Sequence, residues 1–362
     1  MHVMTVIGAR PQFIKAAPVC FALRDAGIRE TLVHTGQHYD EGMSEIFFRE
    51  LGIPTPNVNL GVGSDSHGKQ TAAMLEGIDA LLLRERPDIM VVYGDTNSTL
   101  AGALAARKLD VPLAHIEAGL RSFNRSMPEE TNRVLTDHCS TLLFCPTEQA
   151  VAHLAKENIT EGVHRVGDTM FDAVRLFTAR AEQQSRVLSD LGLAPKAYYL
   201  ATVHRPYTTD DPERLAATME AFGRLDRPVV FPAHPRTLSR LRAGNISLAA
   251  NVKLIDPVGY FDMLVLQKNA WLIVTDSGGV QKEACFVETP CVTIRPETEW
   301  TETVVSGWNR LAWGDVDVIL AAVAHQQRHV PATRLVAYGD GFAAQKIAGI
   351  LRRQASARSA VA

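Results

Sequence analysis

The sequence predicts an α/β protein built from two Rossmann-like, doubly wound domains with a cleft between them. Short apolar runs alternate with longer segments of helical period, and this alternation restarts near the middle of the chain. The length of 362 residues also exceeds what a single hydrophobic core usually fills. Strands that alternate with helices are expected to pair in parallel through right-handed crossovers.

The first domain is expected to contain five strands and the helices between them. The expected strands are His2–Ile7, Thr31–Thr35, Ile89–Tyr93, Val111–Ile116 and Leu142–Cys145. The clearest helical segments between them are Pro11–Ala26, Asp40–Leu51 and Thr96–Lys108. Each strand is therefore followed by a segment long enough to cross back over the sheet.

The second domain repeats the scheme after a helical segment at Met170–Gln184. Its expected strands are Tyr198–Val203, Val229–Phe231, Lys253–Ile255, Leu272–Thr275 and Cys291–Ile294. We place the domain boundary near Val166–Thr169, which gives domains at 1–168 and 169–343. The remaining residues, 344–362, end in a polar stretch rich in Ala, Arg and Ser that is expected to fray.

Composition and charge exclude several classes of function. The formal net charge is −3, so no bulk field favours nucleic acid or an anionic membrane surface. No apolar run approaches the ~18 residues that cross a bilayer, and we expect a soluble, cytoplasmic protein. The five cysteines form no Cys-x-x-Cys pair and are expected to be reduced and buried.

Polar residues follow almost every expected strand, where ligands bind in open parallel sheets. These segments are Gly8-Ala9-Arg10-Pro11, Gly36-Gln37-His38, Gly94-Asp95-Thr96-Asn97-Ser98-Thr99, Glu117-Ala118-Gly119-Leu120-Arg121, His204-Arg205, His234-Pro235-Arg236 and Asp276-Ser277-Gly278-Gly279.

The segment Asp276-Ser277-Gly278-Gly279 lies between a strand and a helix, so that Ser277 is a plausible N-cap. Free backbone amides, a helix dipole and absent side chains suit such a turn to a diphosphate, although an ordinary capped turn would have the same sequence. Glu283 is expected on a partly exposed start of this helix, where it could accept ribose hydroxyls or merely favour the helix N-terminus. The fingerprints for NAD and ATP are missing, and we expect no cofactor.

Three carboxylates indicate acid/base chemistry in the first domain. Asp95 and Glu117 end successive strands, and Glu129 starts a helix after Pro128. If they lie close together, they raise one another's pKa, which suits proton transfer, but each could instead be a cap or a surface carboxylate.

Basic residues stand near both expected sites. Arg10 and Lys15 could neutralise a phosphate, and His204 follows a strand of the second domain, although a lone histidine is more often structural. No metal is expected, because the carboxylates lack histidine at ligand spacing.

The motifs together resemble the non-hydrolysing UDP-N-acetylglucosamine 2-epimerase family and cover nearly the whole chain. In order, they are Gly8-Ala9-Arg10-Pro11-Gln12-Phe13-Ile14-Lys15, Thr35-Gly36-Gln37-His38, Tyr93-Gly94-Asp95-Thr96-Asn97-Ser98-Thr99, His115-Ile116-Glu117-Ala118-Gly119-Leu120-Arg121, Pro128-Glu129-Glu130-Thr131-Asn132-Arg133 and Thr275-Asp276-Ser277-Gly278-Gly279-Val280-Gln281-Lys282-Glu283-Ala284. The resemblance implies the glycosyltransferase-B architecture, a C-terminal helix over 344–362 that crosses back to the first domain, and a homodimer.

The resemblance also implies the chemistry and the residues that perform it. UDP is eliminated from C1 as the C2 proton is removed, and it returns to a bound 2-acetamidoglycal that is reprotonated on the opposite face. The implied catalytic residues are Asp95, Glu117, Glu129 and His204. The implied substrate- and UDP-binding residues are Arg10, Lys15, His234, Ser277, Gly278, Gly279 and Glu283.

Departures from the family pattern leave the exact sugar open. Gln12, Tyr207 and Trp300 replace residues that the family often has, and the first and last of these changes resemble the branch acting on UDP-2,3-diacetamido-glucuronic acid. The same branch is indicated by Phe47-Phe48, His234-Pro235-Arg236-Thr237 and Asp256-Pro257-Val258-Gly259-Tyr260.

Bacterial members of the family often bind a second, activating substrate molecule beside the active site. Gln37 and His234 match that site, whereas Asp40 and Ala73 do not, so we expect no activation. The competing interpretations of the whole chain are a UDP-sugar-dependent glycosyltransferase and a non-catalytic UDP-sugar sensor.

Overall fold

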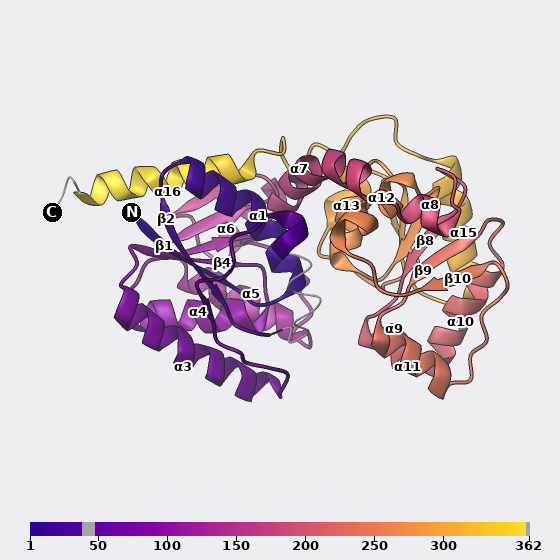
Figure 1. The fold of residues 1–362 in the computed structure, drawn as a ribbon, viewed down its shortest axis with the longest axis horizontal. Coiled ribbons are helices and arrows are strands. Elements are labelled where there is room, and N and C mark those ends of the chain that lie inside the picture. Colours follow the sequence, from indigo (N-terminus) through magenta and orange to yellow (C-terminus); the bar gives the residue numbers. More distant parts are fainter. Residues whose placement is uncertain (38–47, 360–362) are drawn as a thin grey trace. The chain divides into compact units, whose positions relative to one another are not determined.

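The computed structural model describes residues 1–37 and 48–359, and the chain divides into two compact units. Unit 1 comprises Met1–Leu176 together with Val336–Ala362, and unit 2 comprises Phe177–Leu335. The chain therefore leaves unit 1 once and returns to it at the end. Each unit is built around its own parallel sheet (Figure 1).

Unit 1 contains a seven-stranded sheet in the order β3-β2-β1-β4-β5-β6-β7. Its strands are β1 (His2–Ile7), β2 (Arg29–His34), β3 (Val58–Asn59), β4 (Ile89–Tyr93), β5 (Leu113–Ile116), β6 (Leu142–Cys145) and β7 (Val163–Arg165). Neighbouring strands are parallel throughout, with Val3 opposite both Glu30 and Ile89 in the central register. The carboxyl ends of β1, β4 and β5 therefore meet at one edge of the sheet.

Helices cover both faces of this sheet (Figure 1). They are α1 (Arg10–Asp25), α3 (His67–Glu85), α4 (Asn97–Lys108), α5 (Pro128–Cys139), α6 (Glu148–Lys156) and α16 (Ala343–Ser359). The helix α7 (Thr169–Gln184) begins in unit 1 and ends in unit 2. On one face α4 packs between α3 and α5, and on the other α16 packs against α1. Residues 48–51 are helical, while the rest of the expected helix from Asp40 lies largely outside the described residues.

Unit 2 contains a six-stranded parallel sheet in the order β10-β9-β8-β11-β12-β13. Its strands are β8 (Tyr199–Thr202), β9 (Val229–Pro232), β10 (Val252–Ile255), β11 (Leu272–Thr275), β12 (Cys291–Thr293) and β13 (Asn309–Leu311). Its helices are α8 (Val187–Leu191), α9 (Pro206–Thr209), α10 (Pro212–Gly223), α11 (Pro235–Ala243), α12 (Tyr260–Asn269), α13 (Gly278–Phe286), α14 (Thr301–Val305) and α15 (Val316–Arg328).

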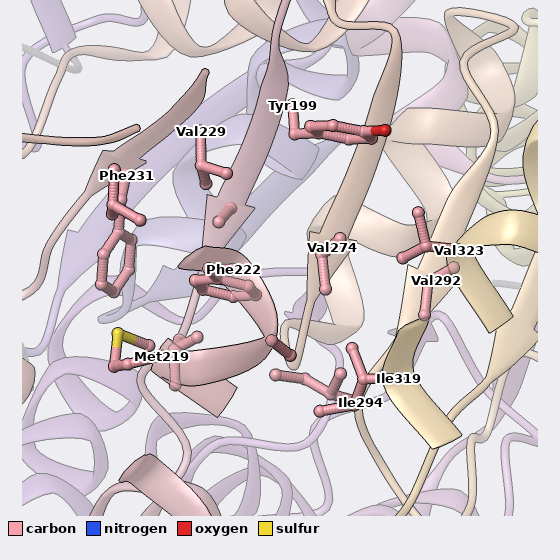
Figure 2. Close-up of a cluster of buried hydrophobic side chains, with 14 of the residues drawn as sticks. Tyr199, Met219, Phe222, Val229, Phe231, Val274, Val292, Ile294, Ile319 and Val323 are labelled. Carbon is pink, nitrogen blue, oxygen red and sulfur yellow. The ribbon is translucent and has the colours of Figure 1, made fainter. Parts of the chain in front are cut away.

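The core of unit 2 lies where α10 and α15 pack on the sheet. Phe222 of α10 meets Phe231 of β9 edge to face, with ring centroids 6.0 Å apart, and Ile319 of α15 is buried in the same cluster (Figure 2). Every second residue of the strands faces this cluster, because successive side chains of a strand point to opposite faces of the sheet. The predicted α/β class with two doubly wound parallel sheets is confirmed.

In unit 1, close packing of α4 against the sheet fixes the turn that precedes this helix. A Cβ at Gly102 would lie 2.9 Å from Cγ1 of Val92 in β4, so only glycine lets the helix approach this closely. Thr96 caps α4 by accepting a hydrogen bond from the Thr99 amide at 3.3 Å. The β4–α4 turn, which carries Asp95, is therefore held by a capped and tightly packed helix.

Candidate functional site

The β1–α1 turn is tied to the β4–α4 turn by the buried side chain of Gln12. Its Oε1 accepts the amides of Gly8 and Ala9 at 2.8 and 2.9 Å. Its Nε2 donates to the Tyr93 carbonyl at 2.8 Å and to the hydroxyl of Thr96 at 3.0 Å. Gln12 thus acts as a strut between two turns and uses both ends of its amide group.

Lys15 and Glu117 form a buried ion pair at the edge of the unit 1 sheet. Lys15 lies on the second turn of α1, and its Nζ donates to Oε2 of Glu117, which follows β5. A Cβ on Gly94 would lie 3.1 Å from that oxygen and 3.6 Å from the lysine nitrogen. Gly94 therefore lets the β4–α4 turn pass directly over the ion pair.

The backbone of Glu117 is in the left-handed region, with φ of 76°. A residue with a Cβ is strained there, and such strain gathers at functional turns. The amides of Glu117 and Ala118 both donate to the Phe144 carbonyl, at 3.1 and 3.2 Å. These two bonds to β6 hold the strained turn and aim the Glu117 side chain at Lys15.

Asp95 is held by the helix that carries Glu129. Its carboxylate pairs with Arg133 of α5, and its backbone carbonyl accepts from Asn132 Nδ2 at 2.9 Å. Asp95 nevertheless keeps 31% of its side chain exposed. Glu129, in the first turn of the same helix, is partly exposed, whereas the adjacent Glu130 is buried.

Two of the three carboxylates are each held by a cation of the same unit. Asp95 and Glu117 each pair with a cation, Arg133 and Lys15 respectively, so a cation lies against each of the two. Two carboxylates on adjacent strands, each oriented by its own cation, can approach a ligand from different directions. Arg10, the first residue of α1, is partly exposed at the same sheet edge.

In unit 2, the turn at Ser277 begins α13 as predicted. Ser277 is the N-cap, and its hydroxyl accepts from the Val280 amide at 3.4 Å. At Gly279 an added Cβ would meet little, since the nearest atom lies 4.0 Å away. At Gly278 the same Cβ would lie 2.9 Å from Oε1 of Glu299. The turn presents backbone amides and a helix N-terminus, which suits it to an anion.

Asp276, which the sequence did not assign a role in the site, connects His204 to this turn. The fully buried carboxylate of Asp276 accepts the amides of His204 and Arg205, both within 3.1 Å. It also lies 3.2 Å from Nδ1 of His204. Burial lowers the pKa of His204, and the charges of Arg205 and Arg295 lower it further, although Asp276 opposes them.

Glu283 differs from the expectation of a partly exposed residue. It is 4% exposed, and its Oε2 accepts from Gln267 Nε2 on α12 at 2.8 Å. Burial and the hydrogen bond and charge of Glu283 also raise the pKa of Tyr260 well above its usual value. The reason is that α13 packs against α12, so the sixth residue of α13 points into the unit.

His234 lies at the end of the next strand, β9. It is the N-cap of α11, and its Nδ1 accepts from the Arg236 amide at 3.2 Å. This imidazole has therefore a capping role in the unit, whatever else it binds.

Of the sequence departures at Tyr207 and Trp300, Trp300 lies beside the Ser277 turn. Besides Glu299, an added Cβ on Gly278 would meet Nε1 of Trp300 at 3.4 Å and a guanidinium nitrogen of Arg205 at 3.8 Å. Burial raises the pKa of Tyr207, and the charges of Arg205, Asp276 and Glu299 also act on it. Trp300 therefore lies beside this turn, which no sequence spacing indicated.

The remaining sequence observations are less decisive. Asp40 and Phe47 lie outside the described residues. Within 1–37 and 48–359, His, Cys, Asp and Glu side chains form no group of three suited to a metal ion. No helix in these ranges is long and apolar enough to span a membrane.

Together, the two parallel sheets and the two polar sheet edges define an α/β protein of the glycosyltransferase-B type. A family model for UDP-N-acetylglucosamine 2-epimerase matches residues 22–352. The chain belongs to the UDP-N-acetylglucosamine 2-epimerase family.

Among curated relatives, a UDP-N-acetylglucosamine 2-epimerase homolog of Methanococcus maripaludis is 49% identical over 359 residues, 97% of this chain and 99% of the relative. The UDP-2,3-diacetamido-2,3-dideoxy-D-glucuronate 2-epimerase of Pseudomonas aeruginosa is 46% identical over 361 residues, covering 98% and 100%. Among solved structures, the Methanocaldococcus jannaschii UDP-GlcNAc 2-epimerase in complex with UDP-GlcNAc and UDP matches with a TM-score of 0.91 and 43% identity, covering 98% and 100%.

Proposed function

We propose that the chain interconverts UDP-N-acetylglucosamine and UDP-N-acetylmannosamine by inverting C2 without hydrolysis. The observation that carries this proposal is the pair of cation-held carboxylates, Asp95 with Arg133 and Glu117 with Lys15, at the carboxyl ends of adjacent strands. The family and the names of the relatives support the same activity.

The proposed reaction is an elimination followed by an addition. A carboxylate removes the C2 proton while the C1–O bond breaks, and UDP leaves with the bonding electrons to give a 2-acetamidoglycal. UDP oxygen then bonds to C1 again, and a proton is delivered to C2 from the opposite face. The reaction consumes and releases no electrons, so it needs acid/base groups on both faces of C2 rather than an oxidant.

Asp95, Glu117 and Glu129 would form the acid/base set. Asp95 and Glu117 follow different strands, and Glu129 stands on α5, so the three approach the site from separate elements. This separation is what attack on two faces requires. Lys15 and Arg10 would support the charge that builds up as the bond to UDP breaks.

The Ser277 turn of unit 2 would bind the departing UDP. Ser277, Gly278 and Gly279 would offer the diphosphate backbone amides and the N-terminus of α13. His204 would assist the leaving phosphate, oriented by Asp276 behind it. Glu283 and His234 complete the proposed set of UDP-binding residues.

The amide variants of the carboxylates test this proposal. Asp95→Asn, Glu117→Gln and Glu129→Gln should each slow deuterium incorporation at C2 by about a hundredfold or more, because losing a positioned base typically costs ~10²–10⁴ in rate. UDP affinity, measured by calorimetry, should stay near the wild-type value. Incorporation is followed by NMR during turnover of UDP-N-acetylglucosamine in heavy water.

Glu148→Gln is the matched control, because Glu148 is an exposed carboxylate of the same unit that pairs only with Arg165 among the described ion pairs. It should label C2 at the wild-type rate. A wild-type enzyme that turns over the sugar yet leaves C2 unlabelled would exclude the elimination. Sugar transfer to an acceptor, without C2 exchange, would identify a glycosyltransferase instead.

A second candidate substrate is UDP-2,3-diacetamido-glucuronic acid. The observation that favours it is the 46% identity with the Pseudomonas aeruginosa relative over the whole chain. Turnover of both nucleotide sugars in parallel separates the candidates, since the preferred one should show the higher kcat/KM. Both would follow the same chemistry at C2.

We also propose a homodimer formed through the outer helices of unit 1. The helices α3, α4 and α5 lie side by side (Figure 1). Leu83 of α3 (58%) and Leu135 of α5 (44%) are exposed. A pocket of about 490 Å³ opens where these helices begin, lined in part by Leu75 and Leu100. The exposed leucines of these helices and the apolar part of the pocket would favour association with a second copy. We propose separately that the protein is located in the cytoplasm.

Light scattering after size exclusion tests the dimer. The double change Leu83→Glu with Leu135→Glu should halve the measured mass, because charges in an apolar interface are costly to bury. Leu254→Glu is the control, since Leu254 is similarly exposed (41%) but lies in unit 2. An unchanged mass for the double variant would move the interface elsewhere.

A further inference from the structure

His115 is fully buried on β5, behind the turns that carry the candidate carboxylates. Both of its ring nitrogens make short hydrogen bonds. Nδ1 lies 2.7 Å from Oδ1 of Asp137 on α5, and Nε2 lies 2.7 Å from the carbonyl oxygen of Gly94. The proposed reaction assigns no role to this residue.

The partners determine which atoms carry hydrogen. A carbonyl oxygen can only accept, so Nε2 of His115 must donate to Gly94. The other carboxylate oxygen of Asp137 accepts from the Gly119 amide at 3.1 Å and from Arg121 at 2.7 Å. Two donors, one of them the permanently charged guanidinium of Arg121, therefore face this oxygen and favour the ionised carboxylate. An ionised Asp137 can also only accept, which makes Nδ1 a donor.

We infer that His115 is a positively charged imidazolium and a positioning residue, which holds the two turns bearing Asp95 and Glu117 in register for proton transfer. This role rests on the function proposed above. In this role His115 does not act directly on the carboxylate of Asp95 or Glu117, and it exchanges no proton with the substrate. It acts through the backbone of Gly94 and, by way of Asp137, through that of Gly119.

The two backbone contacts bracket the acid/base residues. Gly94 immediately precedes Asp95 and has φ of 62°, while Gly119 follows Glu117 by two residues and has φ of 80°. Glycine adopts these angles without strain, but Glu117 between them has φ of 76°, which is strained for a residue with a Cβ and needs outside support. One imidazolium and one carboxylate supply that support to both turns, so a change at either would move both carboxylates together.

The charge of the imidazolium is balanced along a chain of groups. His115 meets Asp137, Asp137 meets Arg121, and the guanidinium of Arg121 makes two bonds to Glu157, at 2.7 and 2.8 Å. Positive and negative groups alternate as far as Glu157, which is 28% exposed and also lies 3.1 Å from Nε2 of His138. A buried charge is tolerated when it is paired and fully hydrogen-bonded in this way.

NMR of the free wild-type enzyme tests the protonation directly. With histidine labelled by a heavy nitrogen isotope, both ring nitrogens of His115 should give the shifts of protonated imidazole nitrogens at neutral pH. The signal is assigned by its loss in His115→Gln. A spectrum in which one ring nitrogen of His115 is unprotonated would overturn the inference, and this readout does not depend on any activity.

Kinetics test the positioning role. Asp137→Asn removes the negative partner but keeps the shape, and His115→Gln removes the ring that bridges Asp137 and Gly94. Each should lower kcat by roughly a hundredfold, the cost of displacing reacting groups by about 1 Å, while KM changes less than threefold. Melting temperatures of both variants show whether they fold. A folded Asp137→Asn enzyme with wild-type kcat would overturn the positioning role. So would variants in which KM rises by the same factor by which kcat falls.

Inactivity of the wild-type enzyme on every UDP-sugar would be a different failure. It would remove the proposed function, and the kinetic test with it, but the nitrogen shifts would still decide whether His115 is an imidazolium.

Discussion

Glu283 shows how the surroundings of a single residue change a prediction. A partly exposed glutamate could be removed at little cost to folding, but Glu283 is 4% exposed and bonded to Gln267. Removing it would leave buried polar groups unpaired, which typically costs about 1–3 kcal/mol each. Loss of UDP affinity in an alanine variant would therefore be mixed with loss of stability.

The informative change is Glu283→Gln. It keeps the volume and an acceptor for Gln267, so its melting temperature should stay close to the wild-type value, whereas Glu283→Ala should melt lower. If Glu283 binds the ribose, both variants should weaken UDP binding by about 1–3 kcal/mol in calorimetry. Wild-type affinity in the glutamine variant would remove Glu283 from the UDP site.

The sequence located the candidate residues but not their partners. Asp95 and Glu117 could be found because polar residues directly follow apolar strands. Asp276 could be noticed for the same reason, because it also follows a strand. Its contact with the imidazole of His204, however, depends on how the β8–α9 turn folds onto Asp276. Asp137 lay within an expected helix, where nothing indicated that its side chain would face His115 on a strand.

At the scale of elements, most strands were predictable, including β10 at one edge of the unit 2 sheet, but the three shortest edge strands were not. β1, β4, β6 and β11 have the bounds that their apolar runs predict. The strands β3, β7 and β13, which contain only two or three residues each, lie at sheet edges and were not predicted. These three edge strands are short and half solvated, so they lack the continuous apolar run that marks a buried parallel strand.

The start of α16 depends on a carboxylate from another helix. Asp172 of α7 accepts the amides of Ala343 and Ala344 at 3.0 and 2.7 Å. Burial nevertheless raises the pKa of Asp172 from 3.8 to about 6, and the two amide bonds only partly offset it. The folded state therefore binds a proton here more tightly than the unfolded chain does.

This shift gives unit 1 a pH dependence of known sign. The contribution of Asp172 to stability is fully present below pH 3.8 and is lost as the pH rises through about 6. In Asp172→Asn that loss should disappear, so melting temperatures followed by circular dichroism should depend less on pH within this window.

Asp340→Asn is the control for this experiment. The hydrogen bond to Lys346 lowers the pKa of Asp340, so removing this carboxylate should leave the loss of stability between pH 3.8 and about 6 in place. A pH profile for Asp172→Asn that follows the wild-type profile would show that Asp172 is not the group responsible.

At the scale of the whole molecule, the kinetic behaviour depends on whether a second substrate molecule binds. Gln37 and His234 match the activating site of bacterial relatives, but both have partners in their own units. Oε1 of Gln37 accepts from the hydroxyl of Ser98 at 2.6 Å, and His234 caps α11. Gln37 and His234 therefore have structural roles that do not involve an activating substrate molecule. Ala73 on α3 has no charge with which to bind such a molecule.

We therefore expect simple hyperbolic kinetics. Initial rates measured against UDP-sugar concentration should fit one binding event, and the reverse reaction should start without a lag on pure product sugar. Sigmoidal rates, or a reverse reaction that needs a trace of the forward substrate, would show that an activating site exists.

The return of the chain to unit 1 has a consequence for its synthesis. Ile347 and Leu351 of α16 are fully buried in unit 1, where this helix packs on α1. A ribosome makes α1 among the first residues and α16 among the last, so the nascent first unit must wait, with the surface for α16 uncovered, until all of unit 2 has been translated. Exposed apolar surface of this kind attracts chaperones and other nascent chains. Unit 2, whose residues are contiguous, is the part of the chain that can finish folding before synthesis ends.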